Sequence, residues 1–501
     1  MAAPTAAPAG SAAASSPEFI RGIGPLAAIS LVVGSMIGSG IFIVSADIGR
    51  QVSAWGPGAL LVVWLVTGAM TVTGALAYAE LAAMMPKAGG QYVFLREGLT
   101  PLAGFLYGWT LFAVIQTGTI AAVAVAFAKF LSILVPSIGP DVFLTLGHLH
   151  LPGASDAIQL GLSPQRVVAI VMIGVLTATN MRGVTLGAAI QTVFSVAKVG
   201  ALAALVLLGL TIFRQPDIAD ANFSNFWGTG EWSVAVIPVL GAAMVGSLFS
   251  SDAWNNVTFA AAEVRDPTRN LPRALAIGTG TVSLLYILAN LAYLNVLPFY
   301  GEANGADVLA RGLQYAAQDR VGTAAIEVVL GAGAATVMAV AILLSTFGCN
   351  NGLILSGPRV YYAMARDNLF FASAGRLHPT FRTPTFGLVA QAVWAGVLCI
   401  SGTYGQLLDY VIFAALVFYF LTTIALFRLR RTRPDLPRPV KAFGYPVLPA
   451  LYLLAVGALM VILLVERPLY TWPGLLIVAS GVPVYMVWRR GGRRSGSSTG
   501  L

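Results

Sequence analysis

The sequence predicts an all-α membrane protein with twelve transmembrane helices, of which the first and the sixth are discontinuous. Hydrophobic residues make up 57% of the 501 positions and charged residues only 10%, with a mean hydropathy of +0.81. No soluble globular domain approaches this composition. Apolar runs of about 20 residues, the length that crosses a bilayer, recur along the chain. Two of these runs contain glycine-rich or polar residues at their centres, which predicts the interruptions.

Twelve apolar segments are expected to span the membrane. They cover residues 22 to 50, 57 to 85, 101 to 135, 164 to 181, 186 to 213, 234 to 263, 272 to 298, 323 to 364, 384 to 402, 405 to 428, 445 to 465 and 471 to 489. Residues 88 to 98 are shorter and amphipathic, so we place them at the cytoplasmic interface, where they would brace spans 2 and 3.

Basic residues set the expected orientation. Most of the 29 Lys and Arg residues fall in alternate loops, and this positive-inside bias places both termini in the cytoplasm. The net charge of +9 follows from the same bias, so no nucleic-acid partner is expected. We expect a multi-pass protein of the cell (inner or plasma) membrane. Its parts are a disordered cytoplasmic tail (1–20), spans 1 to 5 (21–213), spans 6 to 10 (234–428), spans 11 and 12 (445–489) and a cytoplasmic tail (490–501).

Cysteine and histidine usage excludes two other classes of protein. Cys349 and Cys399, the only two cysteines, lie in apolar segments. We expect buried thiols there and no disulfide framework. The three histidines lie in predicted loops, so neither a metal site nor a cofactor is expected.

The first interruption is predicted at residues 34 to 42, GSMIGSGIF. Glycine costs about 1 kcal/mol relative to alanine inside a helix. Gly34 and Gly38 have the four-residue spacing at which small residues let membrane helices pack closely. Gly40 does not share this spacing, and Ser39 lies between two glycines. Gly38 to Gly40 therefore predict a break whose amide groups turn inward.

A second interruption is predicted at residues 248 to 256, LFSSDAWNN. Asp252 would either cap a helix that restarts at about Ala253 or contact a ligand directly, and the two roles are compatible. The two interrupted spans each open a block of five, which is typical of inverted repeats around a site at the bilayer midplane. Helix-end amides suit an anionic group and freed carbonyls a cationic one, so an α-amino acid is the ligand that fits best.

Lys198 lies well inside the fifth span. Gln191, Ser195 and Lys198 are spaced i, i+4 and i+7, so they share one helical face that should point into the bundle. Snorkelling is the alternative, which the long apolar stretches on both sides disfavour. A buried ammonium group can occupy the place of a coupling cation, which would make transport independent of sodium, or it can transfer a proton. Lys129, near the end of its span, is expected to snorkel.

Five motifs then resemble one known family. They are GSMIGSGIF, GALAYAELAAMMPKAGGQYVFL, SVAKVGAL, LFSSDAWNNVTFAAAEVRDPTRNLPRAL and FGCNNGLILSGPRVYYAMARDNLF. Together they resemble the amino acid, polyamine and organocation (APC) transporter superfamily, and within it the L-type amino acid transporter branch. The resemblance runs in order from about Pro17 to Arg382. It implies a LeuT-like fold of two inverted five-helix repeats followed by two further helices.

The resemblance also implies residue roles. The amides of Gly38, Ser39 and Gly40, with the Ser39 hydroxyl, would bind the substrate carboxylate. The α-ammonium group would be received by the backbone carbonyls of Met36, Phe249, Ser250 and Asp252. Phe249 would also close over the substrate as a gate, although it could simply be a lipid or core contact. Trp254 and Asn255 would line the pocket. Lys198 would replace the sodium site and contact spans 1 and 8, where Ser345 or Thr346 is the candidate partner.

Two departures from the family pattern bear on partners and substrate. Animal members carry a cysteine after span 3 that bonds a heavy chain, whereas residues 136 to 163 have none. No disulfide-linked heavy chain is therefore expected, and a chain rich in Ala, Gly and Arg is typical of a bacterial member. Ser251 and Asp252 stand where members with large substrates have a bulky aromatic residue and a glycine. This favours small or medium neutral side chains, although the aspartate would also suit a cationic one.

The leading hypothesis is a secondary transporter that moves neutral L-amino acids by alternating access without sodium, as an exchanger or with protons. The alternatives are an antiporter of cationic amino acids or polyamines and, with less support, an amino acid sensor. An enzyme is not expected, because the spans contain no catalytic motif. Charged residues at the predicted cytoplasmic ends of spans 2 and 6 are either gating ion pairs or interfacial anchors: Glu80, Glu263, Arg265 and Asp266.

Overall fold

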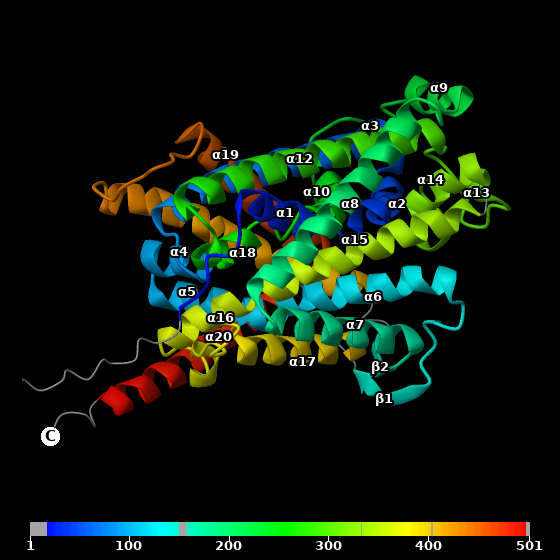
Figure 1. The fold of residues 1–501 in the computed structure, drawn as a ribbon. Helices are drawn as coiled ribbons and strands as arrows, with labels where there is room; N and C mark the ends of the chain where they lie inside the picture. The colour runs from blue at the N-terminus through cyan, green and yellow to red at the C-terminus, as the bar shows by residue number, and fades with distance from the viewer. Residues whose placement is uncertain (1–17, 150–157, 332, 402–403, 497–501) are drawn as a thin grey trace, which may run out of the picture.

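The computed structural model describes residues 18–149, 158–331, 333–401 and 404–496. They form one bundle of helices (Figure 1), with α3 and α12 side by side along one face and α7 and α17 along the opposite face. Within the described ranges, nine helices are long and apolar enough to cross a membrane. Most of the expected tail at 1–20 lies outside the described residues.

The helices of the first half begin at residues suited to helix starts. Pro25, Pro101 and Pro164 stand in the first turn of their helices, and the Ser163 hydroxyl accepts the Arg166 amide. The segments are α1 (Pro25–Met36), η1 (Gly40–Phe42), α2 (Val44–Gln51), η2 (Ser53–Trp55), α3 (Gly56–Met84), α4 (Gln91–Gly98), α5 (Pro101–Thr110), the π-helical η3 (Leu111–Ile115), α6 (Gln116–Leu134), α7 (Pro164–Met181), α8 (Val184–Leu210) and α9 (Pro216–Ser224).

The second half follows the same pattern of long apolar helices with short connecting ones. Its segments are α10 (Val236–Ser250), α11 (Asn256–Phe259), η4 (Ala261–Glu263), α12 (Pro267–Val296), α13 (Val308–Arg311), η5 (Ala317–Asp319), α14 (Val321–Leu330), α15 (Ala334–Ser356), α16 (Pro358–Arg366), η6 (Ala372–Gly375), α17 (Thr385–Ser401), α18 (Tyr404–Thr432), α19 (Val447–Glu466) and α20 (Pro468–Gly496).

Both predicted interruptions are confirmed. The first span stops at Met36 and resumes as a short 3₁₀ turn at Gly40, while the sixth stops at Ser250. Its second part begins at Asn256, so the predicted restart at about Ala253 was wrong. The predicted spans at 22–50, 234–263 and 384–402 contain apolar helices shorter than a full span. The count of twelve and the inverted-repeat relation stay predictions.

Two connections differ from the predictions. A hairpin of β1 (Leu144–Leu149) and β2 (Ile158–Leu162), paired antiparallel, lies in a segment where no strand was predicted. The predicted span at 323–364 is three consecutive helices. Gly331, with φ +74°, ends α14, and Pro358, which has no amide hydrogen, begins α16.

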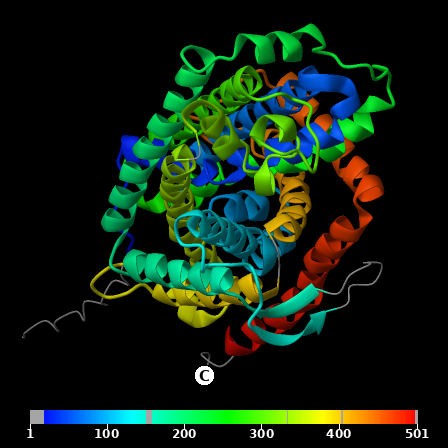
Figure 2. The ribbon, with the colours of Figure 1, turned by 90° about the vertical axis from the view of Figure 1, so that its right-hand side faces the viewer.

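Packing places the two interruptions inside the bundle. Figure 2 looks along the helices and shows α6 enclosed by α7, α15, α17 and α18. The helix α1 packs against α8, α12 and α15, and α10 packs against α3 and α18. The ends of α1 and α10 are therefore surrounded by continuous helices that can fix their geometry.

The short amphipathic helix α4 is a brace, and of its two main partners the one in span 3 was expected and the one in span 10 was not. It packs on α5 and on α18, so it links span 3 to span 10 as well as following span 2. Arg96 on α4 pairs with Asp367, and Arg433 pairs with Glu97 at 3.2 Å. Partial burial raises the pKa of Glu97, but hydrogen bonds from Arg96 and Arg433 outweigh it and hold this pKa below its ordinary value.

Two buried carboxylates anchor neighbouring helices. Arg359 on α16 makes two hydrogen bonds to Glu263, at 2.7 and 2.9 Å, and both side chains are about 1% exposed. Glu80 on α3 pairs instead with Arg430 and Arg438 and accepts the Ala442 amide at 2.7 Å. The two carboxylates therefore belong to separate clusters.

The two other charged residues expected near these carboxylates have different settings. The Arg265 side chain donates to the Arg21 carbonyl at 3.2 Å. Asp266 precedes α12 with a left-handed backbone (φ +44°) and is exposed. Among the described residues these four charges form no ion pair with one another, and a gating role and interfacial anchoring both stay predictions.

The ion pair between Glu263 and Arg359 yields a stability prediction. Glu263→Gln leaves a buried guanidinium without its counter-charge, and we expect a loss of about 3 to 5 kcal/mol. Thermal unfolding of the purified protein, followed by tryptophan fluorescence, measures it. Asp220→Asn, which removes the exposed partner of Arg214, is the control and should cost less than about 1 kcal/mol. A melting temperature for Glu263→Gln equal to that of Asp220→Asn would contradict the prediction.

Candidate functional site

Lys198 on α8 holds the end of α1. Its ammonium group donates to three backbone carbonyls, those of Gly34 at 2.6 Å, Ile37 at 2.7 Å and Ser345 at 3.1 Å. The side chain is 2% exposed, so it does not snorkel. Ile37 leaves the helix with an extended backbone (ψ 95°), which turns its carbonyl away from the helix axis. All three ammonium protons are therefore used on two helices, α1 and α15.

The face shared by Gln191, Ser195 and Lys198 is confirmed, and it packs against α1. The Ser195 hydroxyl donates to the Ser30 carbonyl at 2.9 Å, and the Gln191 amide donates to the same carbonyl at 3.4 Å. A Cβ on Gly34 would lie 2.0 Å from Gln191 Nε2 and 2.2 Å from Ser195 Oγ. Gly34 is therefore required for the close approach of α1 to α8.

Ser345, and not Thr346, completes the lysine site. The Ser345 hydroxyl lies 3.2 Å from the Ile37 carbonyl and 3.1 Å from that of Gly38, in addition to the bond that its own carbonyl accepts from Lys198. The Thr346 hydroxyl donates to Ile342 within its own helix at 2.8 Å. Of the two candidates on span 8, only Ser345 reaches the break.

The amides of the first interruption lie between two helical stretches. The Ile37 amide donates to the Val33 carbonyl at the end of α1, and the Phe42 amide donates to the Ser39 carbonyl in the turn that follows. Ser39 is 1% exposed, and both flanking glycines, Gly38 and Gly40, are buried. The segment expected to bind a carboxylate is therefore buried between the end of α1 and the turn at η1.

The two interruptions touch each other at Gly40 and Ser250. A Cβ on Gly40 would lie 2.0 Å from Ser250 Oγ and 3.1 Å from Ser250 Cα. Only glycine permits this approach, because a methyl group would overlap the second interruption. Close packing was predicted for Gly34 and Gly38 from their four-residue spacing. It also explains why residue 40 is a glycine.

Tyr286 on α12 bridges the two interruptions, and the sequence did not single it out. Its hydroxyl lies 3.1 Å from the Met36 carbonyl and 3.0 Å from the Ser250 carbonyl. A phenol has one proton, so it donates to one of the two carbonyls at a time. These are two of the carbonyls expected to receive an ammonium group. A tyrosine in an apolar span is indistinguishable from a packing residue by pattern alone.

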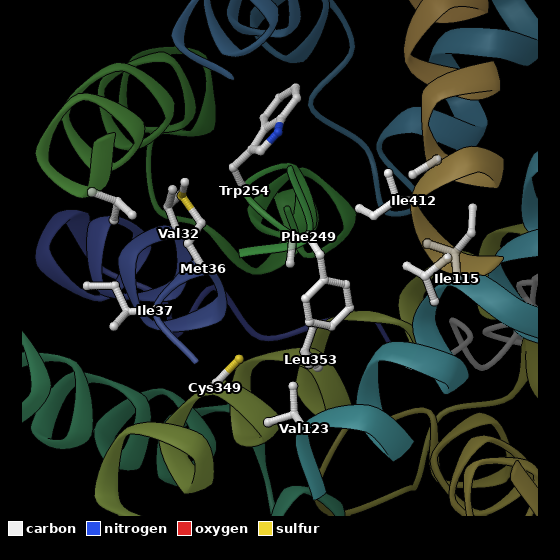
Figure 3. Close-up of a cluster of buried hydrophobic side chains, with 14 of the residues drawn as sticks. Val32, Met36, Ile37, Ile115, Val123, Phe249, Trp254, Cys349, Leu353 and Ile412 are labelled. Atoms are coloured by element: carbon white, nitrogen blue, oxygen red, sulfur yellow. The ribbon is translucent and has the colours of Figure 1, made fainter. Parts of the chain in front are cut away.

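Phe249 fills the space between the interruptions. Figure 3 shows its ring at the centre of a hydrophobic cluster, with Met36 and Cys349 on one side, Ile115 on the other and Leu353 beside it. The pockets that flank Asp252 have volumes of about 10 and 20 Å³, room for about one water each. The space between the two interruptions, where a midplane site is predicted, is therefore closed in this structure, with the Phe249 ring inside it.

Asp252 faces α18 and caps no helix. Its carboxylate accepts a hydrogen bond from the Tyr419 hydroxyl. The N-cap of α11 is Asn255, without a side-chain cap bond, so the predicted capping role of Asp252 was wrong. Direct contact with a ligand stays open, because Asp252 lines both small pockets. Tyr419, like Tyr286, carries no signal in the sequence pattern.

Trp254 and Asn255 are fixed by the scaffold around them. The Trp254 ring stacks on Tyr419 at 5.2 Å and meets Tyr78 edge-on at 4.7 Å. The Asn255 amide donates to Gln91 on α4 at 2.7 Å. The helix α4 therefore supports the second interruption directly.

The two cysteines are buried, as expected. The Cys349 thiol donates to the Ser35 carbonyl at 3.0 Å, next to the first interruption. Over the residues that the structure describes, no three His, Cys, Asp or Glu side chains gather as metal ligands would.

Comparison with known proteins gives a consistent picture. The family model described as amino acid permease matches residues 23–488. The chain is 28% identical to the b(0,+)-type amino acid transporter 1 of Rattus norvegicus over 477 residues, covering 93% of this chain and 87% of the relative. It is 30% identical to the large neutral amino acids transporter small subunit 2 of Homo sapiens over 474 residues, covering 93% and 80%.

Contact between the interruptions yields a rescue prediction. Gly40→Ala places a methyl group against Ser250 and should separate the two breaks, lowering the melting temperature and abolishing ligand binding. Ser250→Gly in the same chain makes room for that methyl group and should restore the melting temperature in large part. Thermal unfolding in detergent measures both, and Gly174→Ala, where a Cβ meets open space, is the control. Equal melting temperatures for Gly40→Ala and Gly174→Ala would contradict the contact.

The Tyr286 hydroxyl yields a second prediction. Tyr286→Phe keeps the ring but removes the donor shared by Met36 and Ser250, and we expect a loss of about 1 kcal/mol in the free energy of unfolding. Tyr300→Phe, on an exposed side chain, should change stability by much less. Chemical denaturation monitored by fluorescence distinguishes them, and an unchanged midpoint for Tyr286→Phe would show that the bridge contributes nothing.

Proposed function

The chain belongs to the amino acid permease family, a group of membrane transporters and not enzymes, and from this premise we propose its substrate and coupling. We propose that it moves neutral L-amino acids across the cell membrane by alternating access and without sodium, either by exchange or with protons. Amino acid transport in general follows from the family. The neutral substrate and the sodium independence are our proposal.

The observation on which the proposal rests is the ammonium group of Lys198. Broken helices in transporters coordinate a cation through carbonyls freed from the helix. Here the carbonyls of Gly34, Ile37 and Ser345 are all bonded to Lys198 Nζ. An ammonium group at these oxygens would leave no coordination site for sodium. The same group would hold α1 and α15 together whether or not sodium is present.

Substrate binding is proposed at the two interruptions. The substrate carboxylate would accept hydrogen bonds from the amides of Gly38, Ser39 and Gly40. These amides lie at the N-terminal, positive end of the dipole of the helical turn that follows. The α-ammonium group would be received by the backbone carbonyls of Met36, Phe249, Ser250 and Asp252. The Tyr286 hydroxyl now lies within hydrogen-bond distance of two of these oxygens, so it would give up its bond to them as substrate enters. Phe249 would move out of the midplane site and act as the gate.

A cationic substrate is the second candidate, and Asp252 favours it. Its buried carboxylate lines the pocket that also contains Gln116, Thr119 and Asn255. A basic side chain could replace the bond from Tyr419 with an ion pair. We rank neutral substrates first because Asp252 already has this hydroxyl partner and the pockets are small. If Asp252→Asn selectively removes transport of basic substrates, the protein is an antiporter of cationic amino acids or polyamines.

We also propose the membrane topology, on the basis of the sequence pattern and the family. It comprises twelve spans in two inverted five-helix repeats plus two, with both termini in the cytoplasm. A disulfide-linked partner is not expected, because both thiols are buried. Lys129 and Thr346 have no assigned role in this scheme.

Uptake into proteoliposomes tests the proposal. Radiolabelled neutral and basic amino acids are supplied with sodium or with choline, with and without internal amino acid, and with and without a pH gradient. We expect equal uptake in sodium and choline, and a response to internal amino acid or to the pH gradient. Uptake that required sodium would overturn the proposal.

The lysine is tested in the same assay. Lys198→Ala should reduce uptake by at least tenfold, because three carbonyls lose their donor and the first interruption loses its shape. Lys87→Ala, which removes an exposed lysine, is the matched control. Both variants should be recovered as folded protein by size-exclusion chromatography. Full activity of folded Lys198→Ala would refute the role of the ammonium group.

A further inference from the structure

A second, wider cavity lies away from the midplane site, at the end of the bundle that carries α13 and α14 (Figure 1). Its volume is about 160 Å³, compared with about 10 and 20 Å³ for the pockets beside Asp252. The walls come from the end of α6, from α13, η5 and α14, and from the start of α15. Space of this size holds a small organic molecule and not only single waters.

Charged groups of both signs line this cavity. Arg311 and Arg320 contribute guanidinium groups, and Glu327 contributes a carboxylate. Arg311 Nε donates a hydrogen bond to the Asp307 carbonyl at 3.3 Å. No salt bridge links Glu327 to either arginine within the described part of the chain. The cavity therefore offers separate places for an anionic and a cationic group.

Arg320 is held in position while part of its guanidinium group stays unused. One terminal nitrogen donates to the Lys129 carbonyl at 2.8 Å and to Gln318 Oε1 at 2.6 Å, and the group lies over the Phe130 ring at 5.5 Å. Its Nε atom is buried and has no partner among the described residues. A preorganised guanidinium group with a free donor is suited to a carboxylate.

Thr323 adds an unused hydroxyl group to the same wall. The residue is 7% exposed, and its Oγ1 atom has no hydrogen-bond partner in the described structure. A buried hydroxyl without a partner costs free energy. A ligand that supplied the missing bond would recover that cost, so the hydroxyl favours occupation of the cavity by a polar molecule.

We propose that this cavity is a second binding site for a free α-amino acid, with the carboxylate at Arg320 and Arg311, the ammonium group at Glu327 and a hydrogen bond from Thr323. The ligand class rests on the proposed function, whereas the site rests on the cavity and its charges. A zwitterion satisfies both signs of charge at once, which neither a simple amine nor a simple carboxylate does. The site would hold substrate before or after it passes the midplane.

Cysteine labelling tests the site without relying on transport. Both native cysteines are buried, so Ala317→Cys on the cavity wall supplies the reactive thiol for a fluorescent maleimide, with the unmodified chain as the blank. The probe is L-alanine, with ethylamine and propionate as its two half-ligands. For a Kd of about 1 mM, L-alanine at about 10 mM should slow labelling roughly tenfold. Ethylamine and propionate should leave the rate nearly unchanged.

Matched variants in the Ala317→Cys background identify the groups responsible. Glu327→Gln removes the anionic group without changing size, and Thr323→Val removes the hydroxyl; both should weaken protection at least threefold. Glu231→Gln, an exposed carboxylate elsewhere, should leave it intact. Equal labelling rates with and without L-alanine, or full protection in Glu327→Gln, would overturn the proposal.

A last variant separates this site from the midplane site. In a chain that carries Ala317→Cys and Lys198→Ala, protection by L-alanine should persist even though transport is lost. Loss of protection there would mean that the label reports closure at the midplane, which would also overturn the second site. Uptake that requires sodium, together with intact protection by L-alanine, would contradict the proposed sodium independence and still support the second binding site.

Discussion

The structure depends on one lysine at the point where a membrane helix stops being a helix. An interrupted span exposes carbonyl oxygens to a low-dielectric interior, where each unpaired group costs several kcal/mol. Lys198 pairs two of those oxygens on α1 and one on α15. The charge of the ammonium group and the dipoles of the carbonyls stabilise each other, so neither is left unpaired inside the bundle. Gly34 makes this possible by letting α8 lie close enough to reach.

The second interruption is held by different means, and this difference bears on motion. Ser250 packs against Gly40 of η1, and its carbonyl shares the Tyr286 hydroxyl with the Met36 carbonyl of α1. Farther along the chain, the buried pair of Glu263 and Arg359 ties the segment after the break to α16. A ligand that replaced the Tyr286 bonds would therefore act on the junction between α1, α10 and α12. The lysine contacts need not change in that step.

Sequence reasoning found the backbone features of the site and missed most of its side-chain partners. Glycines at unusual spacing and polar residues inside apolar runs indicate an interrupted helix. Helical periodicity predicts that Gln191, Ser195 and Lys198 share one face. Tyr286 and Tyr419 escaped because a tyrosine in an apolar span has no periodic signature. The partners of Glu80 and Glu263 lie far away along the chain, so no local pattern could pair them. A cap was one of the two roles expected for Asp252 because the restart of the helix was placed too early.

A high-resolution structure of the protein with a bound amino acid, determined in sodium chloride, would show whether Lys198 or a sodium ion occupies the freed carbonyls. We expect density for the Lys198 side chain continuous to the carbonyls of Gly34, Ile37 and Ser345, with the ligand carboxylate at Gly38 to Gly40. An ion at those carbonyls, with the lysine turned elsewhere, would contradict this expectation.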